Sequence, residues 1–306
     1  MTMKKKNKPN KPLDLIRICR PNQWYKNIVI FLPLIFVLQL FNLANFTKVL
    51  IGFFSLAFMS SVNYIINDLK DRNQDRSHPE KKHRPIASGR VKGMEAIILA
   101  VLLFALSVYI AFNLSKLFLV SVLFLFAFTQ IYTFYLKNEV FADVIGIAVN
   151  FVNRSVAGAF IIQVVVSPWL ILCTFFLAIF LAIAKRQSDI ILLKDKARNH
   201  KKVLAHYTPE LTNALMIIST TALILSYALY SFLRNQEILM ITLPFSIYVV
   251  LRYFDHAKKG SVIARHPEKF YKDKKMVAGI LLWVVATIIL LYYSNFIINM
   301  TRGLLR

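Results

Sequence analysis

The sequence predicts an all-α, polytopic membrane protein with nine transmembrane helices. Hydrophobic residues make up 57% of the 306 residues, and Phe alone occurs 25 times. Mostly apolar runs of about 20 residues, the length that crosses a bilayer as a helix, recur along the chain. Lys and Arg, 38 in all against 15 Asp and Glu, lie mainly between these runs, as in the loops of membrane proteins. The net charge of +23 therefore indicates topology rather than a nucleic-acid partner.

Each predicted span is a mostly apolar run bounded by polar or charged residues. The first run follows a basic tail, residues 1–26, and the last leaves only a short C-terminal tail, residues 300–306. Residues 27–299 are predicted to form a single transmembrane domain. In chain order, the spans cover residues 27–47, 49–67, 94–113, 117–136, 141–165, 168–185, 209–233, 238–253 and 276–298.

The basic residues determine the predicted orientation. Most of them fall in the N-terminal tail and in three long loops, residues 68–92, 185–207 and 252–275, all on one side of a nine-span topology. Cytoplasmic loops of membrane proteins are enriched in Lys and Arg. We therefore expect a multi-pass protein of the plasma (inner) membrane, with its N-terminus and these three loops in the cytoplasm.

An acidic cluster at the end of the second predicted span is the most informative feature. Asp68, Asp71 and Asp75, together with Asn67, recur three or four residues apart, so on a helix they project from one stripe. Carboxylates this close repel one another unless a cation lies among them. Oxygen ligands suit Mg²⁺, which proteins hold through one or two carboxylates together with substrate phosphates. We therefore predict that the three aspartates are Mg²⁺ ligands and catalytic residues, with Asn67 beside the substrate.

Cations follow these acids in the same loop. Lys81 and Arg84 lie in a basic stretch shortly after Asp75. A Mg²⁺–diphosphate substrate needs both parts, because the metal bridges carboxylate to phosphate while the cations neutralise the remaining oxygens. The alternative is a solvated loop whose charge only sets topology. The acidic stripe beside the basic stretch favours the substrate site.

These residues resemble a known family. The run from Asn67 to Asp75 matches in full the Asn-Asp-x-x-Asp-x-x-x-Asp signature of the UbiA superfamily of intramembrane prenyltransferases. The continuation through Gly89, and the segment from Arg20 to Asn27, are similar to the branch of polyprenyl-phosphate phosphoribosyltransferases. The resemblance extends along nearly the whole chain. It implies a UbiA-like bundle of nine helices and a catalytic role for the transmembrane domain.

The loop after the sixth span separates the branches of this family. UbiA-type aromatic prenyltransferases carry a second Asp-x-x-x-Asp motif there, because they hold an allylic diphosphate between two metal clusters. Here the loop begins with Lys185, Arg186 and the single acid Asp189, which resembles the phosphoribosyltransferase branch, where the acid is generally Glu. The resemblance implies that Lys185 and Arg186 bind phosphate. Alternatively, both only end the sixth span at the membrane surface.

Further polar residues lie near or within the spans. Tyr132 and Lys137 lie at a short cytoplasmic turn, in a pattern loosely similar to that of the family and implying substrate contacts. Arg154 lies within the fifth span, where a charged side chain usually faces a cavity or a partner. It is a candidate for a phosphate contact or for an ion pair with an acid such as Asp143. Ahead of the first span, the candidates for binding a lipid phosphate are Arg20, Gln23 and Lys26.

The resemblance implies an enzyme, a pentosyltransferase. Its Mg²⁺-dependent reaction would transfer 5-phosphoribose from phosphoribosyl pyrophosphate to a polyprenyl (decaprenyl-type) phosphate and release pyrophosphate, as in cell-wall precursor synthesis. Positioning and charge neutralisation suffice for this chemistry, because the acceptor phosphate is already ionised near neutral pH. A UbiA-type aromatic prenyltransferase acting on a polyprenyl diphosphate is the first alternative, and a non-enzymatic membrane transporter is the second. The sequence is also compatible with an oligomer.

Overall fold

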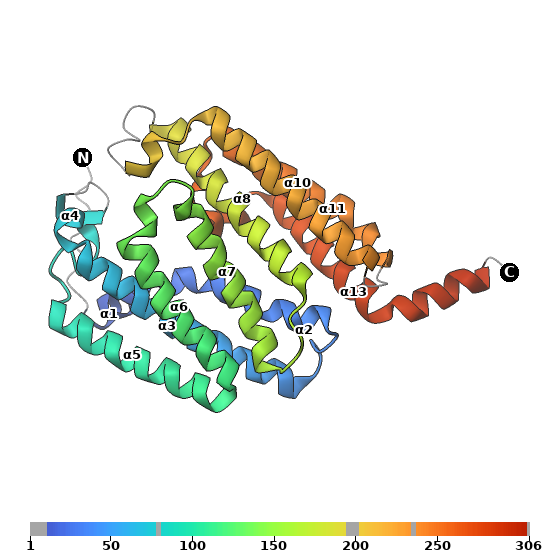
Figure 1. The fold of residues 1–306 in the computed structure, drawn as a ribbon, viewed down its shortest axis with the longest axis horizontal. Helices are drawn as coiled ribbons and strands as arrows, with labels where there is room; N and C mark the ends of the chain where they lie inside the picture. The colour runs from blue at the N-terminus through green and yellow to red at the C-terminus, as the bar shows by residue number, and fades with distance from the viewer. Residues whose placement is uncertain (1–10, 78–80, 194–201, 234–236, 305–306) are drawn as a thin grey trace, which may run out of the picture.

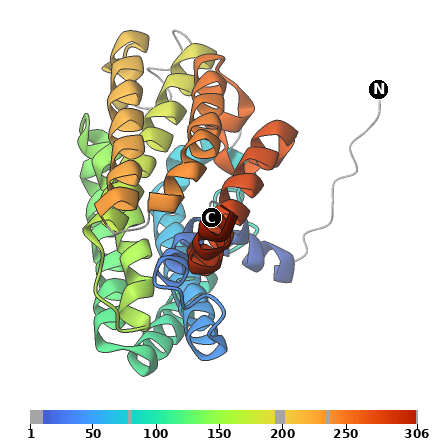
Figure 2. The same cartoon turned by 90° about the vertical axis from the view of Figure 1, so that its right-hand side faces the viewer.

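The computed structural model describes residues 11–77, 81–193, 202–233 and 237–304. Across these ranges every helix or strand that can be assigned is an α-helix or a 3-10 helix, so the all-α prediction is confirmed. The long helices run side by side in one bundle, which Figure 1 and Figure 2 show from two perpendicular directions. Helices that follow one another in the chain are mostly also neighbours in space.

Eight helical segments in the described part of the chain are long and apolar enough to cross a membrane. Their outer surface is apolar; on α5, for example, Leu102, Tyr109 and Phe112 are more than half exposed. Such rows are stable when lipid covers them. The protein is therefore a multi-pass membrane protein. The eight segments are α3 (Leu43–Lys70), α5 (Gly93–Leu114), α6 (Lys116–Phe134), α7 (Ala142–Ile161), α8 (Pro168–Leu193), α10 (Pro209–Leu233), η6 with α11 (Glu237–Thr242 and Leu243–Lys258) and α13 (Lys274–Leu304).

The first predicted span, residues 27–47, is not one continuous helix. The chain forms the 3-10 helix η1 (Pro21–Phe31) and the short α2 (Leu32–Phe36), and then turns before α3 begins. Leu38 adopts a left-handed backbone conformation with a φ of 58°, which interrupts a right-handed helix. Asn42 then caps α3, because its side chain accepts a hydrogen bond from a first-turn amide at 3.1 Å. The predicted boundary between the first two spans therefore lies inside α3.

η1 and α2 together are still long enough to cross the bilayer. A 3-10 helix rises about 2 Å per residue, so the two consecutive elements extend about 30 Å, which is the thickness of the hydrocarbon core. They pack along α7. Gly158 of α7 permits this close approach, because a β-carbon at that position would overlap the carbonyl oxygen of Ile30. With the eight longer segments, the described residues thus contain nine segments able to span, close to the predicted arrangement.

Seven of the short elements lie at the end of the bundle where α3 ends. Figure 1 shows α1 and α4 at this end. Contacts also join η3 to η5, α12 to α8, and η7 to η1. The described parts of the three long polar loops therefore lie at one end of the molecule. These seven elements are α1 (Lys11–Cys19), α4 (Arg72–Ser77), η2 (Lys81–His83), η3 (Leu136–Asn138), η5 (Lys202–Ala205), α12 (Val262–Arg265) and η7 (Pro267–Lys272).

Candidate active site

The residues of the acidic stripe still project from one face, although the helix is interrupted at Asp71. α3 ends at Lys70, and Asp71 stands between α3 and α4 with a φ of −86° and a ψ of 5°. The backbone amide of Asp71 still donates to the carbonyl of Asn67 at 2.9 Å, and that of Asp75 donates to the carbonyl of Asp71 at 2.8 Å. Because these bonds continue the helical pattern, the predicted stripe is preserved across the junction.

Arg84 joins the two buried ends of this stripe. Its Nη1 donates to Oδ1 of Asp68 at 2.9 Å and to Oδ2 of Asp75 at 2.7 Å. Both aspartates are almost fully buried, with 4% and 3% of their surface exposed. Two carboxylate oxygens thus converge on one cationic nitrogen, so the predicted phosphate-binding residue Arg84 here neutralises the predicted metal ligands.

Three other predicted cations also reach the acids. Nη2 of Arg20 donates to Oδ1 of Asp68 at 2.5 Å. Nζ of Lys81 lies 3.8 Å from Asp75, and Nζ of Lys137 lies 3.4 Å from both carboxylate oxygens of Asp71. The structure therefore brings together Arg20, Lys81, Arg84 and Lys137 around the acidic cluster, with half-buried Asn67 in the last turn of α3.

The carboxylate oxygens of the acidic cluster are ligands of the kind that a divalent cation prefers. Asp68 and Asp75 present hard oxygen ligands toward a common position that already attracts a positive charge. Within the described residues, no three acidic, His or Cys side chains converge closely enough to form a complete metal site. A divalent ion would therefore have to displace Arg84, and a substrate phosphate would have to complete its shell.

A second polar centre joins α7, α8 and the segment after η5. Asp143 is buried with 1% of its surface exposed, and its Oδ2 accepts a hydrogen bond from Nε of Arg186 at 3.0 Å and lies 2.9 Å from Nη2 of the same guanidinium. The Tyr207 hydroxyl donates to Oδ1 of Asp143 at 2.7 Å. Burial and this acceptor raise the pKa of Tyr207 above its ordinary value, so the hydroxyl keeps its proton. The predicted residue Tyr132 also interacts with Arg186.

Arg154 does not form the ion pair with Asp143 that the sequence suggested. Eleven residues separate them on α7, which corresponds to about 16 Å along a helix, beyond the reach of an ion pair. Nε of Arg154 instead donates to the Asn27 side-chain oxygen of η1 at 2.9 Å, and its Nη1 donates to the carbonyl of Asn150 at 3.3 Å. Arg154 thus connects α7 to η1.

Lys26 and Lys185 lie between these centres. Lys26 of η1 is close enough to Lys185 of α8 and to Tyr64 of α3 to interact electrostatically with both. Lys185 is exposed. Glu268 of η7 is close enough to Lys185 and to Tyr25 of η1 to interact electrostatically with both, so the third polar loop also reaches this region.

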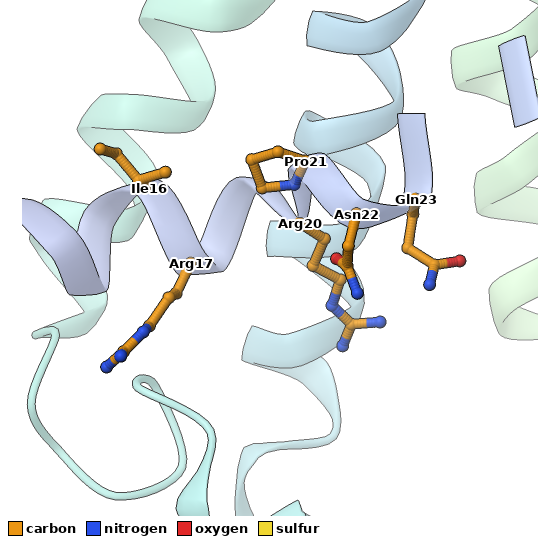
Figure 3. Close-up of a pocket in the computed structure, with 6 residues that line it drawn as sticks. All are labelled: Ile16, Arg17, Arg20, Pro21, Asn22 and Gln23. Carbon is orange, nitrogen blue, oxygen red and sulfur yellow. The ribbon is translucent and has the colours of Figure 1, made fainter. Parts of the chain in front are cut away.

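Gln23 lies in a pocket at the junction of α1 and η1. The pocket has a volume of about 510 Å³. Figure 3 shows Arg20, Asn22 and Gln23 projecting to the same side of this segment, with Arg17 pointing away from them. Arg20 therefore borders the pocket and also contacts Asp68, so the pocket lies next to the acidic cluster. Its lining consists of Ile16, Arg17, Arg20, Pro21, Asn22 and Gln23.

Comparison with known proteins decides the family. The model of the UbiA prenyltransferase family matches residues 28–266 of this chain. The chain belongs to this family. The UbiA chain is similar to the decaprenyl-phosphate phosphoribosyltransferase of Corynebacterium glutamicum, with 31% identity over 94% of this chain and 90% of the relative. It is also similar to the enzyme of that name from Mycolicibacterium smegmatis, with 30% identity over 92% of this chain and 93% of the relative.

Solved structures agree on the UbiA fold. A UbiA homolog from Archaeoglobus fulgidus, bound to GPP and Mg²⁺, superposes with a TM-score of 0.68 at 21% identity. The match covers 91% of this chain and 99% of that chain. This likeness shows the fold, and it confirms the prediction of a UbiA-like bundle.

Several residues of this UbiA site were missed by the sequence analysis as site residues. Tyr207 and Tyr64 were not predicted, because they are uncharged and the site residues were sought mainly among charged side chains. Arg265 of α12 donates to the buried Asp189 at 2.8 Å, which explains that acid as a support for the third loop. Asn27 was noticed only as the end of a motif. For Tyr64, Asn27 and Tyr207 the signal is a polar residue at or beside the start or end of a predicted span, whereas Arg265 lies within the third polar loop.

Proposed function

We propose that this UbiA protein transfers 5-phosphoribose from phosphoribosyl pyrophosphate to a polyprenyl phosphate and releases pyrophosphate. The observation that carries the proposal is the asymmetry of its two polar centres. One centre contains the three clustered aspartates. The other contains Lys185 and Arg186, and its acids are isolated: Asp143 forms an ion pair with Arg186, and Asp189 is the single acid of the loop. The names of the relatives that span nearly the whole chain support the same activity.

The acidic cluster is proposed to bind the pyrophosphate of the donor. Asp68, Asp71 and Asp75 would hold Mg²⁺, which when bound neutralises the leaving pyrophosphate. Arg84 has a second role in this proposal. If the carboxylates that Arg84 now contacts were to hold the metal, the Arg84 guanidinium would be free to bind phosphate oxygens together with Lys81. Arg84 and Lys81 would thus neutralise first the carboxylates and then the leaving group.

The acceptor needs no general base. A phosphate oxygen of the lipid forms a bond to the anomeric carbon, and the bond from that carbon to the pyrophosphate oxygen breaks with its electron pair. Arg20, Gln23 and Lys26 belong to the segment that leads into the membrane through η1. They are proposed to place the lipid phosphate beside the acidic cluster, where positioning accounts for most of the rate.

The proposed orientation places this site in the cytoplasm. The basic loops that contain it satisfy the rule for cytoplasmic segments, and the plasma membrane supplies the lipid. A water-soluble phosphorylated donor then reaches the carboxylates from the polar end of the bundle. The acceptor stays in the bilayer.

The proposed activity is tested with the purified full-length protein in detergent. Labelled phosphoribosyl pyrophosphate, Mg²⁺ and a polyprenyl phosphate should yield a phosphoribosylated lipid. Asp71→Asn should abolish the product, whereas the matched exposed variant Asp255→Asn on α11 should not. Turnover of a prenyl diphosphate with an aromatic acceptor, and no phosphoribosylated lipid, would favour the prenyltransferase alternative. If neither product forms, the result would favour the second alternative, a non-enzymatic membrane transporter.

A further inference from the structure

Arg154 is a buried charge with only neutral partners. Its surface is 8% exposed, and its hydrogen bonds go to the Asn27 side-chain oxygen and the Asn150 carbonyl. By contrast, buried Arg186 has Asp143 as a counter-ion. Within the described residues no acid forms an ion pair with Arg154. A buried charge without a counter-ion is costly in a membrane-spanning segment, so such a residue marks a place where an anion binds.

Asn27 supplies an independent indication at the same place. It is buried with 1% of its surface exposed, and its side-chain oxygen is used by Arg154. Its Nδ2, however, is buried with no hydrogen-bond partner in the described residues. An unsatisfied buried donor is rare in folded proteins. A missing acceptor beside Arg154 would satisfy both side chains at once.

More donors surround Tyr64 next to this pair. Lys26 and Arg154 are both near enough to the Tyr64 hydroxyl to interact with it electrostatically. The guanidinium carbon of Arg20 lies 5.0 Å from the centre of the Tyr64 ring. The nearest acid on the same helix, Asp68, is already bound by Arg20 and Arg84. The positive charge around Tyr64 is therefore not balanced by the acidic cluster.

We propose that Arg154, Asn27, Lys26 and Tyr64 form a binding site for the phosphate monoester of the lipid acceptor, separate from the carboxylates that receive the donor. This proposal rests on the proposed function. A phosphate monoester offers several acceptor oxygens, which match the guanidinium, ammonium, amide and hydroxyl donors of these four residues. Asn27, Tyr64 and Arg154 thereby acquire a specific role in binding the acceptor.

The position of the cluster favours the lipid over the donor. Tyr64 lies four residues before Asp68, about 6 Å further along α3 and away from its polar end. Arg154 is likewise about three turns from the polar end of α7. The cluster therefore lies on the membrane side of the acidic site. The lipid enters from that side, whereas the soluble donor enters from the other, and the two phosphates meet one helical turn apart.

Binding is measured with the full-length protein in detergent and EDTA, without donor, using farnesyl phosphate, farnesol and inorganic phosphate as probes. Wild type should bind farnesyl phosphate more tightly than either other probe. Arg154→Gln should weaken this binding at least about 10-fold, and Tyr64→Phe about 3- to 10-fold, because each removes a donor to an anion. Arg154→Lys, which keeps the charge, should fall between wild type and Arg154→Gln.

Matched controls separate this site from the fold and from the donor site. Lys48→Gln at the start of α3 and the exposed Tyr109→Phe on α5 remove the same groups elsewhere and should leave binding unchanged. Asp71→Asn should also leave farnesyl phosphate binding unchanged. Equal binding by all variants, or equal binding of inorganic phosphate and farnesyl phosphate, would overturn the proposal.

Kinetics then distinguish the acceptor from the 5-phosphate of the donor. Tyr64→Phe and Arg154→Lys should raise the KM for the polyprenyl phosphate and leave the KM for phosphoribosyl pyrophosphate unchanged. The reverse pattern would assign the cluster to the donor and overturn the proposal. If wild type binds farnesyl phosphate through these residues but forms no phosphoribosylated lipid, the proposed function fails while the anion site stands.

Discussion

Asp143→Asn offers the most direct test of the second polar centre. The substitution removes the carboxylate that forms an ion pair with Arg186 and accepts one hydrogen bond from Arg186 and one from Tyr207. The amide is nearly the same size, so the packing of α7 against α8 is retained. The guanidinium of Arg186 is then left buried without its counter-ion.

The expected loss of stability is large because both partners are buried. Their side chains are 1% and 3% exposed, so water cannot replace the missing charge. Breaking a buried ion pair by removing one partner typically costs about 3–5 kcal/mol. A change of 1 kcal/mol shifts the melting temperature of a chain of this size by about 2 °C, so Tm should fall by roughly 6–10 °C.

The assay is thermal unfolding in detergent, combined with a double-mutant cycle. Asp143→Leu with Arg186→Met replaces the pair with apolar residues of similar volume and should recover most of the stability, because no charge remains buried. Phosphoribosyl transfer by this double variant then reports whether the Arg186 charge also serves the substrate. A Tm for Asp143→Asn within about 1 °C of wild type would refute the reasoning.

Three further predictions follow from other parts of the structure. Asp71→Asn should lower phosphoribosyl transfer at least ~100-fold without changing Tm, because this aspartate is partly exposed and serves the substrate; retained activity at ordinary Mg²⁺ would remove it from the site. Gly158→Ala should destabilise the protein by about 1–3 kcal/mol in thermal unfolding, because its methyl group would overlap η1, whereas Gly93→Ala meets no atom closer than 3.9 Å and serves as the neutral control. A hydrogen bond from Arg252 holds the pKa of Asp273 below its ordinary value, so the contribution of Asp273 to stability is present above about pH 4 and is lost as the pH falls further. Asp273→Asn should therefore flatten the decline of Tm in acid, and an unchanged decline would contradict this account.

The family and the acidic stripe could be predicted from the sequence because both depend on local patterns. Apolar runs of bilayer length predict spanning helices whatever their neighbours are. The spacing from Asn67 to Asp75 places the acids on one face through helical periodicity alone, and a turn at Asp71 did not disturb it. The first span was predicted less well, because α2 ends at Phe36 and the left-handed Leu38 then turns the chain, and no hydropathy pattern encodes that end.

Which cation meets which acid depended on the packing of distant helices. Arg20 reaches Asp68 across 48 residues, and Arg154 reaches Asn27 across 127. Such pairs depend on the rotation and register of each helix against its neighbours, and these are set by close packing such as that of Gly158 against Ile30. Composition carries no information about them.

The sequence alone thus determined a membrane protein of the UbiA type, with a cation-binding stripe of acids and basic polar loops. Only the tertiary structure decided that Arg84 forms ion pairs with the acids of the stripe, that Asp143 neutralises Arg186, and that Arg154 has no acidic partner among the described residues. The physical reason is that helical periodicity depends only on residues close together in the chain. A buried charge, by contrast, is neutralised by a side chain of another helix or by a bound ligand, and this depends on how the helices pack.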